Sequence, residues 1–127
     1  MFYQVNTHSE PEQLYNLTMV DKMCRGNQKT ILKMVNVFIS QISISVQEIT
    51  EASQKKDISR LKNEIHKVKP TLTYYGTTKI EKELLGLERL VNGIFTADEI
   101  EMNITTFNTI ITQTIAKMKI DFSISNN

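Results

Sequence analysis

The sequence predicts an all-α protein, folded as an antiparallel up-down-up-down four-helix bundle with a short extra helix at its N-terminal side. Apolar residues recur every three or four positions over four long segments of the 127-residue chain, the period of a helix with one buried face. Capping residues open these segments, and the four glycines and two prolines serve largely as punctuation between them. Amphipathic helices joined by short loops bury their apolar faces in an antiparallel bundle.

A short first helix is expected over Leu14–Cys24, ending near Gly26, which suits the left-handed conformation that often closes a helix. Asn27 is a suitable N-cap for the second helix. The apolar positions of this helix follow helical steps: Ile31, Val35, Phe38, Ile42, Val46 and Ile49. Residues 42–46 also alternate like a strand, but the helical spacing continues on both sides of them, so we predict a helix.

The third helix is expected to begin after Asp57, a good N-cap, and to end at Gly76. Its apolar residues recur at alternating steps of three and four, so they share one face of the helix. They are Ile58, Leu61, Ile65, Val68, Leu72 and Tyr75. This face is predicted to lie in the core.

Two capping-box patterns open the last two helices. Thr78 and Glu81 precede a fourth helix that ends at residues 92–93, and Thr96 and Glu99 precede the fifth. The fifth helix is rich in isoleucine and threonine, which lowers its intrinsic propensity, so packing must stabilise it. The positions predicted to face inward are Ile80, Leu84, Leu87 and Val91, then Ile100, Ile104, Phe107, Ile111, Ile115 and Met118.

Length and composition indicate one domain over residues 14–120, with tails at 1–13 and 121–127. The net charge of +1 shows no bias toward nucleic acid. The single cysteine, Cys24, excludes an internal disulfide and fits a reducing compartment, where it is expected to be a packed thiol. No stretch approaches the ~20 apolar residues of a membrane span, and the first residues do not have the pattern of a signal peptide. A cytoplasmic location is therefore expected.

His66 is the residue that carries the chemistry we predict. It directly follows Ile65, about 100° round the third helix from the buried face, so its ring is expected in water at the edge of that face. Its neighbours on the helix surface are Lys62, Lys67, Lys69, Pro70 and Thr73. An imidazole is largely unprotonated at neutral pH and can act as a nucleophile, and nearby ammonium groups would stabilise a phosphoryl group on the ring.

The sequence around His66 lacks the parts of an autonomous enzyme. It has no glycine-rich phosphate loop, Walker signature or acidic cluster for Mg²⁺, so a phosphoryl carrier is predicted. The alternative for a surface histidine flanked by lysines is an ordinary solvated face. His8 and His66 have no cysteine or acidic residue at ligand spacing, so no metal site is expected.

Residues 57–90, DISRLKNEIHKVKPTLTYYGTTKIEKELLGLERL, resemble the histidine-phosphotransfer (HPt) family of two-component phosphorelays. The family pattern is an apolar residue, the histidine, two residues, a lysine, a small residue, and a glycine ten positions after the histidine. Here the apolar residue, histidine, lysine and glycine are Ile65, His66, Lys69 and Gly76. Residues 15–27 are similar to the short first helix of the family, so the resemblance spans roughly residues 15–119.

The resemblance implies that His66 accepts a phosphoryl group from an aspartyl-phosphate receiver domain, of a response regulator or hybrid sensor kinase, and passes it to another regulator. It implies that Lys69 offsets charge on the phosphoryl group, and that Glu88 accepts a hydrogen bond from the other ring nitrogen; an ordinary surface glutamate is the equal alternative. The partner-binding surface would include Lys62, Lys67, Pro70 and Thr73. No cofactor is expected on this chain, because the Mg²⁺ belongs to the receiver, and a monomer is expected.

Pro70 departs from the family pattern, which usually has glycine there. A proline within a helix removes one backbone donor and clashes with the carbonyl four residues earlier, which is that of His66. A local kink at His66 is therefore expected. Two other functions stay open at this point: a non-catalytic helical interaction module, and a degenerate HPt domain that binds receivers without carrying phosphate.

Overall fold

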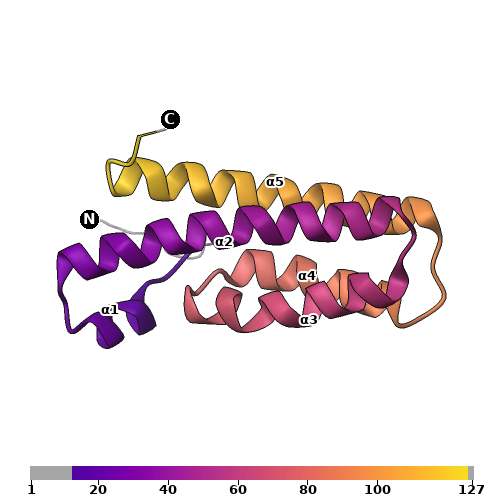
Figure 1. Cartoon of the computed structure of the whole chain (residues 1–127), viewed down its shortest axis with the longest axis horizontal. Helices are drawn as coiled ribbons and strands as arrows, with labels where there is room; N and C mark the ends of the chain where they lie inside the picture. Colours follow the sequence, from indigo (N-terminus) through magenta and orange to yellow (C-terminus); the bar gives the residue numbers. More distant parts are fainter. Residues whose placement is uncertain (1–12, 126–127) are drawn as a thin grey trace, which may run out of the picture.

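The computed structural model describes residues 13–125, so His8 and all but Gln13 of the predicted N-terminal tail lie outside the described residues. Within residues 13–125 the chain forms five helices and no strand, which confirms the all-α prediction. The helices are α1 (Thr18–Cys24), α2 (Gln28–Gln54), α3 (Ile58–Tyr74), α4 (Thr78–Val91) and α5 (Ala97–Asp121). The long helices α2 and α5 lie lengthwise beside each other, with α3 and α4 along their lower side (Figure 1).

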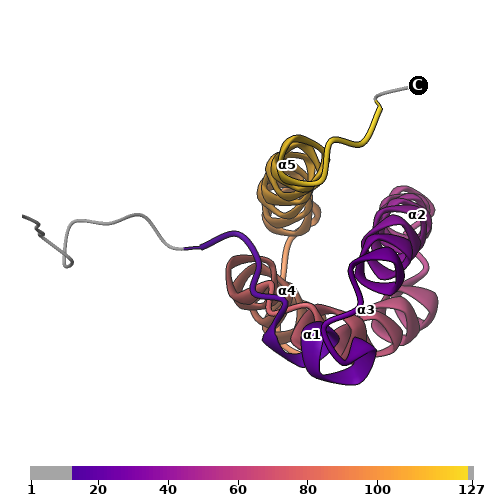
Figure 2. The same cartoon turned by 90° about the vertical axis from the view of Figure 1, so that its left-hand side faces the viewer.

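One hydrophobic core lies between α2, α3, α4 and α5. Each of these helices contacts the next in sequence, α2 also contacts α5, and α1 packs against α2 at one end (Figure 2). The predicted inward positions are buried, except that Val46, Ile58 and Ile115 are half-buried at its margin. Fixing these helices by their apolar faces determines which residues of α3 remain in water.

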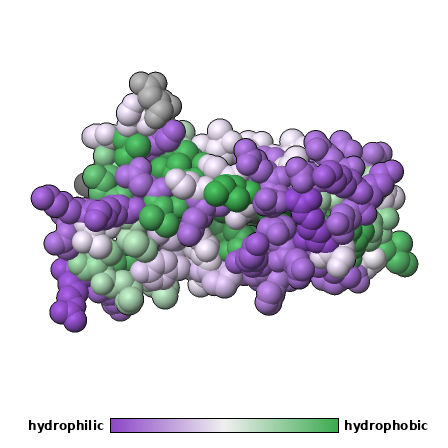
Figure 3. All heavy atoms as spheres, in the orientation of Figure 1, coloured by the Kyte–Doolittle hydropathy of each residue, from purple (hydrophilic) through white to green (hydrophobic). Residues whose placement is uncertain are grey.

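Helix α2 runs unbroken through residues 42–46, so the helical spacing prevailed over the local strand-like alternation. By length and composition alone α2 could cross a membrane, which corrects the expectation that no segment approaches such a span. Its inward face lies in the core, whereas Val37 and Ile44 are exposed on its outer side. Figure 3 shows hydrophobic residues reaching the surface on this side of the molecule among hydrophilic ones.

Three of the predicted helix starts are confirmed by their caps. The side-chain oxygen of Asn27 accepts a hydrogen bond from the backbone N–H of Thr30, at 3.0 Å. The carboxylate of Asp57 accepts one from the backbone N–H of Arg60, at 3.1 Å. Thr96 and Glu99 form the reciprocal capping box that opens α5. Each cap satisfies N–H groups that have no partner within the helix.

The capping box predicted for Thr78 and Glu81 is wrong. Thr77 is the N-cap of α4, and its buried hydroxyl donates to the carbonyl of Leu72, at 2.9 Å, instead of capping α4. The Glu81 carboxylate accepts from the Thr73 hydroxyl of α3, at 2.9 Å. Both groups therefore join α3 to α4, since the tight turn at Gly76 brings the end of α3 beside the start of α4.

The first helix starts at Thr18, and not at Leu14 as predicted. The Asn16 side-chain oxygen accepts from the Thr18 N–H, and the Asn16 N–H donates to the carbonyl of Tyr75, at 3.0 and 3.1 Å. The segment before α1 is thus bound across the end of α3, which a helical backbone there would not allow.

The same segment is also tied to the end of α5. The Tyr15 hydroxyl donates to the Asp121 carboxylate, which also accepts from Lys117. Burial and then this hydrogen bond raise the pKa of Tyr15, whereas the hydrogen bonds from Lys117 and Tyr15 lower the pKa of Asp121. Phe122 also packs against the core beyond α5, within the segment predicted as a C-terminal tail.

Gly76 is the point where the N-terminal segment crosses the α3–α4 turn. Its φ of +62° lies in the left-handed region, and a Cβ atom there would stand 2.4 Å from the carbonyl oxygen of Asn16. Gly76 is thus needed both for the turn and for the close approach of two backbones. Gly26 has a similar φ of +71°, but a Cβ there would meet nothing closer than 4.0 Å.

We predict that Gly76→Ala destabilises the protein by roughly 2–4 kcal/mol, because a left-handed alanine and a backbone clash add together. Gly26→Ala is the matched control and should cost about 1 kcal/mol, since it has the strain without the clash. Urea unfolding followed by circular dichroism measures both free energies. Equal losses in the two variants would contradict the close approach at Asn16.

Candidate functional site

Helix α3 presents His66 to solvent directly beside its buried face. Leu61, Ile65, Val68 and Leu72 lie in the core, and Ile65 is only 1% exposed. One residue further round the helix, His66 is exposed, as its place in the sequence predicts. Within residues 13–125 its ring has no hydrogen-bond or ion-pair partner. The imidazole is therefore presented to solvent from a helix whose apolar face is fixed in the core.

Lys69 lies one turn after His66 and binds a carboxylate from the neighbouring helix. Its Nζ stands 2.8 Å from the Glu88 carboxylate of α4. Both side chains are part-exposed, at 37% for Lys69 and 28% for Glu88. The Lys69 ammonium is thus held toward α4, one turn along α3 from His66, and its charge is balanced by Glu88. Glu88, which the resemblance places against the imidazole, makes its hydrogen bond to Lys69.

The other residues expected around His66 differ in their pairing. Lys67 stands 3.5 Å from the Glu64 carboxylate, and the Thr73 hydroxyl donates to Glu81. Lys62 is exposed and, within residues 13–125, has no such partner. The positive charge that the sequence places around His66 is thus partly neutralised, and Lys62 is its unpaired member.

Helix α3 continues through Pro70 to Tyr74, so the proline does not end it. Pro70 is exposed, and its missing N–H leaves the His66 carbonyl without the usual donor four residues on. The nearby Thr73 hydroxyl contacts the carbonyl of Lys69, at 3.3 Å, and not that of His66.

Two acidic residues of this site were missed by sequence reasoning, Glu64 and Glu81. Glu64 lies three residues before Lys67 on the same helix, a spacing that signals an ion pair. Glu81 was assigned to a capping box, and no sequence spacing signals its contact with Thr73 across two helices. Among residues 13–125 no group of three or more histidine, cysteine, aspartate and glutamate side chains is placed to hold a metal ion.

Chemically, the arrangement offers an exposed nucleophile on α3 with a carboxylate-paired ammonium group one helical turn away. The imidazole can attack an electrophile that approaches α3 from solvent, and Lys69 can exchange its carboxylate partner for an incoming anion. No protein-family model, curated protein or solved structure matches this chain. The likeness to phosphotransfer proteins therefore rests on the residues themselves, chiefly His66, Lys69 and Gly76.

We predict a small favourable coupling between Lys69 and Glu88. Because both side chains are part-exposed, a double-mutant cycle with Lys69→Met and Glu88→Gln should give about 0.3–1 kcal/mol, decreasing in high salt. The Lys117–Asp121 pair, with Nζ 2.7 Å from the carboxylate, is the matched control on one helix. Additive losses at low salt, measured by urea unfolding, would show that the pair does not contribute.

Proposed function

We propose that this chain is a histidine-phosphotransfer protein, which accepts a phosphoryl group on His66 from an aspartyl-phosphate receiver domain and passes it to another response regulator. The observation that carries the proposal is the exposed His66 on α3 with Lys69 one turn away, oriented by Glu88 from α4. The chain would serve as a phosphocarrier, with the Mg²⁺ and much of the catalysis supplied by the receiver.

The proposed fold is the antiparallel up-down-up-down four-helix bundle with α1 as a short extra helix. Contacts between consecutive helices, and between α2 and α5, support this arrangement. In such a bundle α3 is supported on both sides, by α2 and α4, so His66 is held on a rigid element. That rigidity suits in-line attack, where positioning supplies much of the rate.

The proposed transfer step moves the phosphoryl group from an aspartyl oxygen of the receiver to His66 Nε2. The lone pair of His66 Nε2 attacks the phosphorus, the bond from phosphorus to the aspartyl oxygen breaks, and the receiver recovers a free carboxylate. The proton on Nδ1 is then lost to water or held by an acceptor. Lys69 turns from Glu88 toward the phosphoryl oxygens, so that one charge-assisted contact replaces another. Transfer to the second receiver reverses these bonds.

The receiver would dock on the exposed part of α3 around His66. Lys62, Lys67, Pro70 and Thr73 border the histidine on this helix and are all exposed. We place the protein in the cytoplasm as a monomer, without a bound cofactor and without nucleic acid or membrane as partner. In this proposal the apolar composition of α2 serves its packing.

Two alternative functions can be distinguished from phosphotransfer by experiment. A non-catalytic interaction module would bind its partner equally well without the His66 imidazole. A degenerate phosphotransfer domain would bind receivers and take up no phosphate. Phosphate labelling separates both from a carrier.

We predict that His66 is the sole phosphorylation site. A panel of receiver domains, each phosphorylated with radiolabelled acetyl phosphate, should label the protein through a bond that is acid-labile and alkali-stable, as a phosphoramidate is. His66→Gln should abolish labelling and change the free energy of unfolding by less than about 0.5 kcal/mol, because the side chain is exposed. Label on the His66→Gln protein would overturn the proposal, as would failure of every receiver to label the wild type.

We predict that Lys69→Ala slows transfer by a modest factor, up to about tenfold, because a hydrogen bond to a charged group is worth roughly 1.5–3 kcal/mol and the contact with Glu88 that it replaces offsets part of this. Lys62→Ala is the control on the same helix, one turn before His66, and should have a smaller effect. Rapid-quench measurement with one receiver gives both rates. If Lys62→Ala has the larger effect, Lys62 and not Lys69 stabilises the phosphoryl group.

A further inference from the structure

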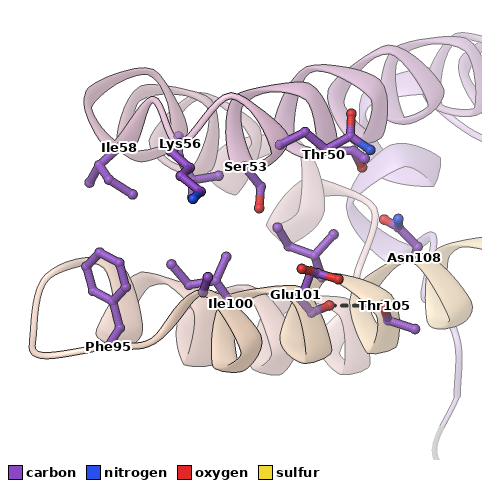
Figure 4. A pocket seen from close by; sticks show the side chains of 13 residues that line it. Thr50, Ser53, Lys56, Ile58, Phe95, Ile100, Glu101, Thr105 and Asn108 are labelled. Atoms are coloured by element: carbon purple, nitrogen blue, oxygen red, sulfur yellow. Dashed lines mark hydrogen bonds between the residues drawn. The ribbon is translucent and has the colours of Figure 1, made fainter.

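A cavity of about 600 Å³ lies between the C-terminal end of α2, the start of α3 and the first half of α5. Its apolar wall includes Ile58 and Leu61 of α3, Phe95 before α5, and Ile104 of α5. Figure 4 shows side chains of α2 and α5 facing each other across the open space, with Ser53 pointing toward α5 and Asn108 toward α2. The volume falls within the range of about 300–1,000 Å³ typical of small-molecule sites.

The cavity lies where α2 and α5 pack less closely than the other neighbouring helices. These helices contact each other along less of their length than α2 with α3, α3 with α4, or α4 with α5. In Figure 2 the ribbons of α2 and α5 are more widely spaced than those of neighbouring helices in the sequence, and α3 and α4 lie below them. Some of the side chains that line it, such as Ser53 and Thr105, are short and fill little of the space.

Two buried oxygen atoms belong to side chains that line this cavity and have no hydrogen-bond partner within the described part of the chain. They are Thr50 Oγ1 and Asn108 Oδ1. Other threonines near the cavity are satisfied: the hydroxyls of Thr105 and Thr112 of α5 donate to backbone carbonyls four residues earlier, at 2.9 Å. A buried polar atom without a partner is unfavourable. The Thr50 hydroxyl can accept or donate and Asn108 Oδ1 can accept, so a bound molecule with a hydroxyl or N–H group would satisfy either atom.

The charges around the cavity indicate what kind of molecule fits. Lys56 and Glu101 are the charged residues of its lining; both are exposed and opposite in sign. The walls between them are apolar or uncharged, and an ionised group buried there would lose its hydration without a paired charge. A hydroxyl or N–H group can instead donate to Thr50 or Asn108 at little cost.

We propose that this cavity binds a small uncharged molecule with an apolar body and one hydroxyl or N–H donor. The apolar body lies against Ile58, Leu61 and Ile104, and the donor reaches Thr50 or Asn108. This site shares no residue with the His66 cluster and does not depend on phosphotransfer. Its test and the labelling test of His66 therefore succeed or fail separately.

Three fluorescent probes with one skeleton test the proposal on the full chain. N-phenyl-1-naphthylamine is neutral and has one N–H donor, its N-methyl derivative lacks the donor, and 1-anilinonaphthalene-8-sulfonate adds a negative charge. We expect saturable binding of the first at one molecule per chain, about 3- to 10-fold weaker binding of the second, and still weaker binding of the third. No saturable binding of the neutral probe, or tighter binding of the sulfonate, would overturn the proposal.

Two variants locate the bound probe. Ser53→Phe fills the cavity from α2 and should weaken binding of N-phenyl-1-naphthylamine at least tenfold, whereas Ser40→Phe, on the exposed part of the same helix, should leave it unchanged. Asn108→Leu should reduce the preference for N–H over N-methyl. Melting curves establish that each variant is folded. Equal binding by the Ser53→Phe and Ser40→Phe proteins would place the probe elsewhere and reject this cavity as the site.

Discussion

Burial of the apolar face of α3 between α2 and α4 is the constraint on which the rest of the structure depends. Because Ile65 and Leu72 must lie in the core, the helix has one possible rotation about its axis. That rotation exposes His66 and turns Lys69 toward α4, where Glu88 meets it. The chemistry proposed for His66 thus follows from a hydrophobic requirement and needs no special backbone geometry at the histidine.

Ion pairs join α3 to each of the two helices beside it, α2 and α4. On one side, Arg60 binds Glu48 and Glu51 of α2; on the other, Lys69 binds Glu88 of α4. The hydrogen bonds that its guanidinium donates to Glu51 and Glu48 raise the pKa of Arg60. The hydrogen bond from Arg60 makes the largest contribution to lowering the pKa of Glu51. The cavity lies where α2 packs loosely on α5. The proposed phosphotransfer site on α3 and the proposed ligand site between α2 and α5 therefore occupy different parts of one small fold.

Most of the helices could be predicted from the sequence, because helical periodicity and capping depend on residues that are close together in the chain. Asn27, Asp57 and the Thr96–Glu99 box each act on the helix that directly follows them. The prediction for Thr78 failed for the opposite reason: Thr77 and Glu81 bind groups of α3, and those groups come into reach only after the chain has turned at Gly76.

The sequence by itself determined the helices found between residues 13 and 125, their buried faces and the exposure of His66, since each depends on residues three or four positions apart. Tertiary structure alone decided the pairing of Lys69 with Glu88, which are 19 residues apart, and the crossing of Asn16 over Gly76. It also decided the cavity between α2 and α5. Such contacts depend on how closely whole helices approach, and this distance is set by the packing of all their side chains together.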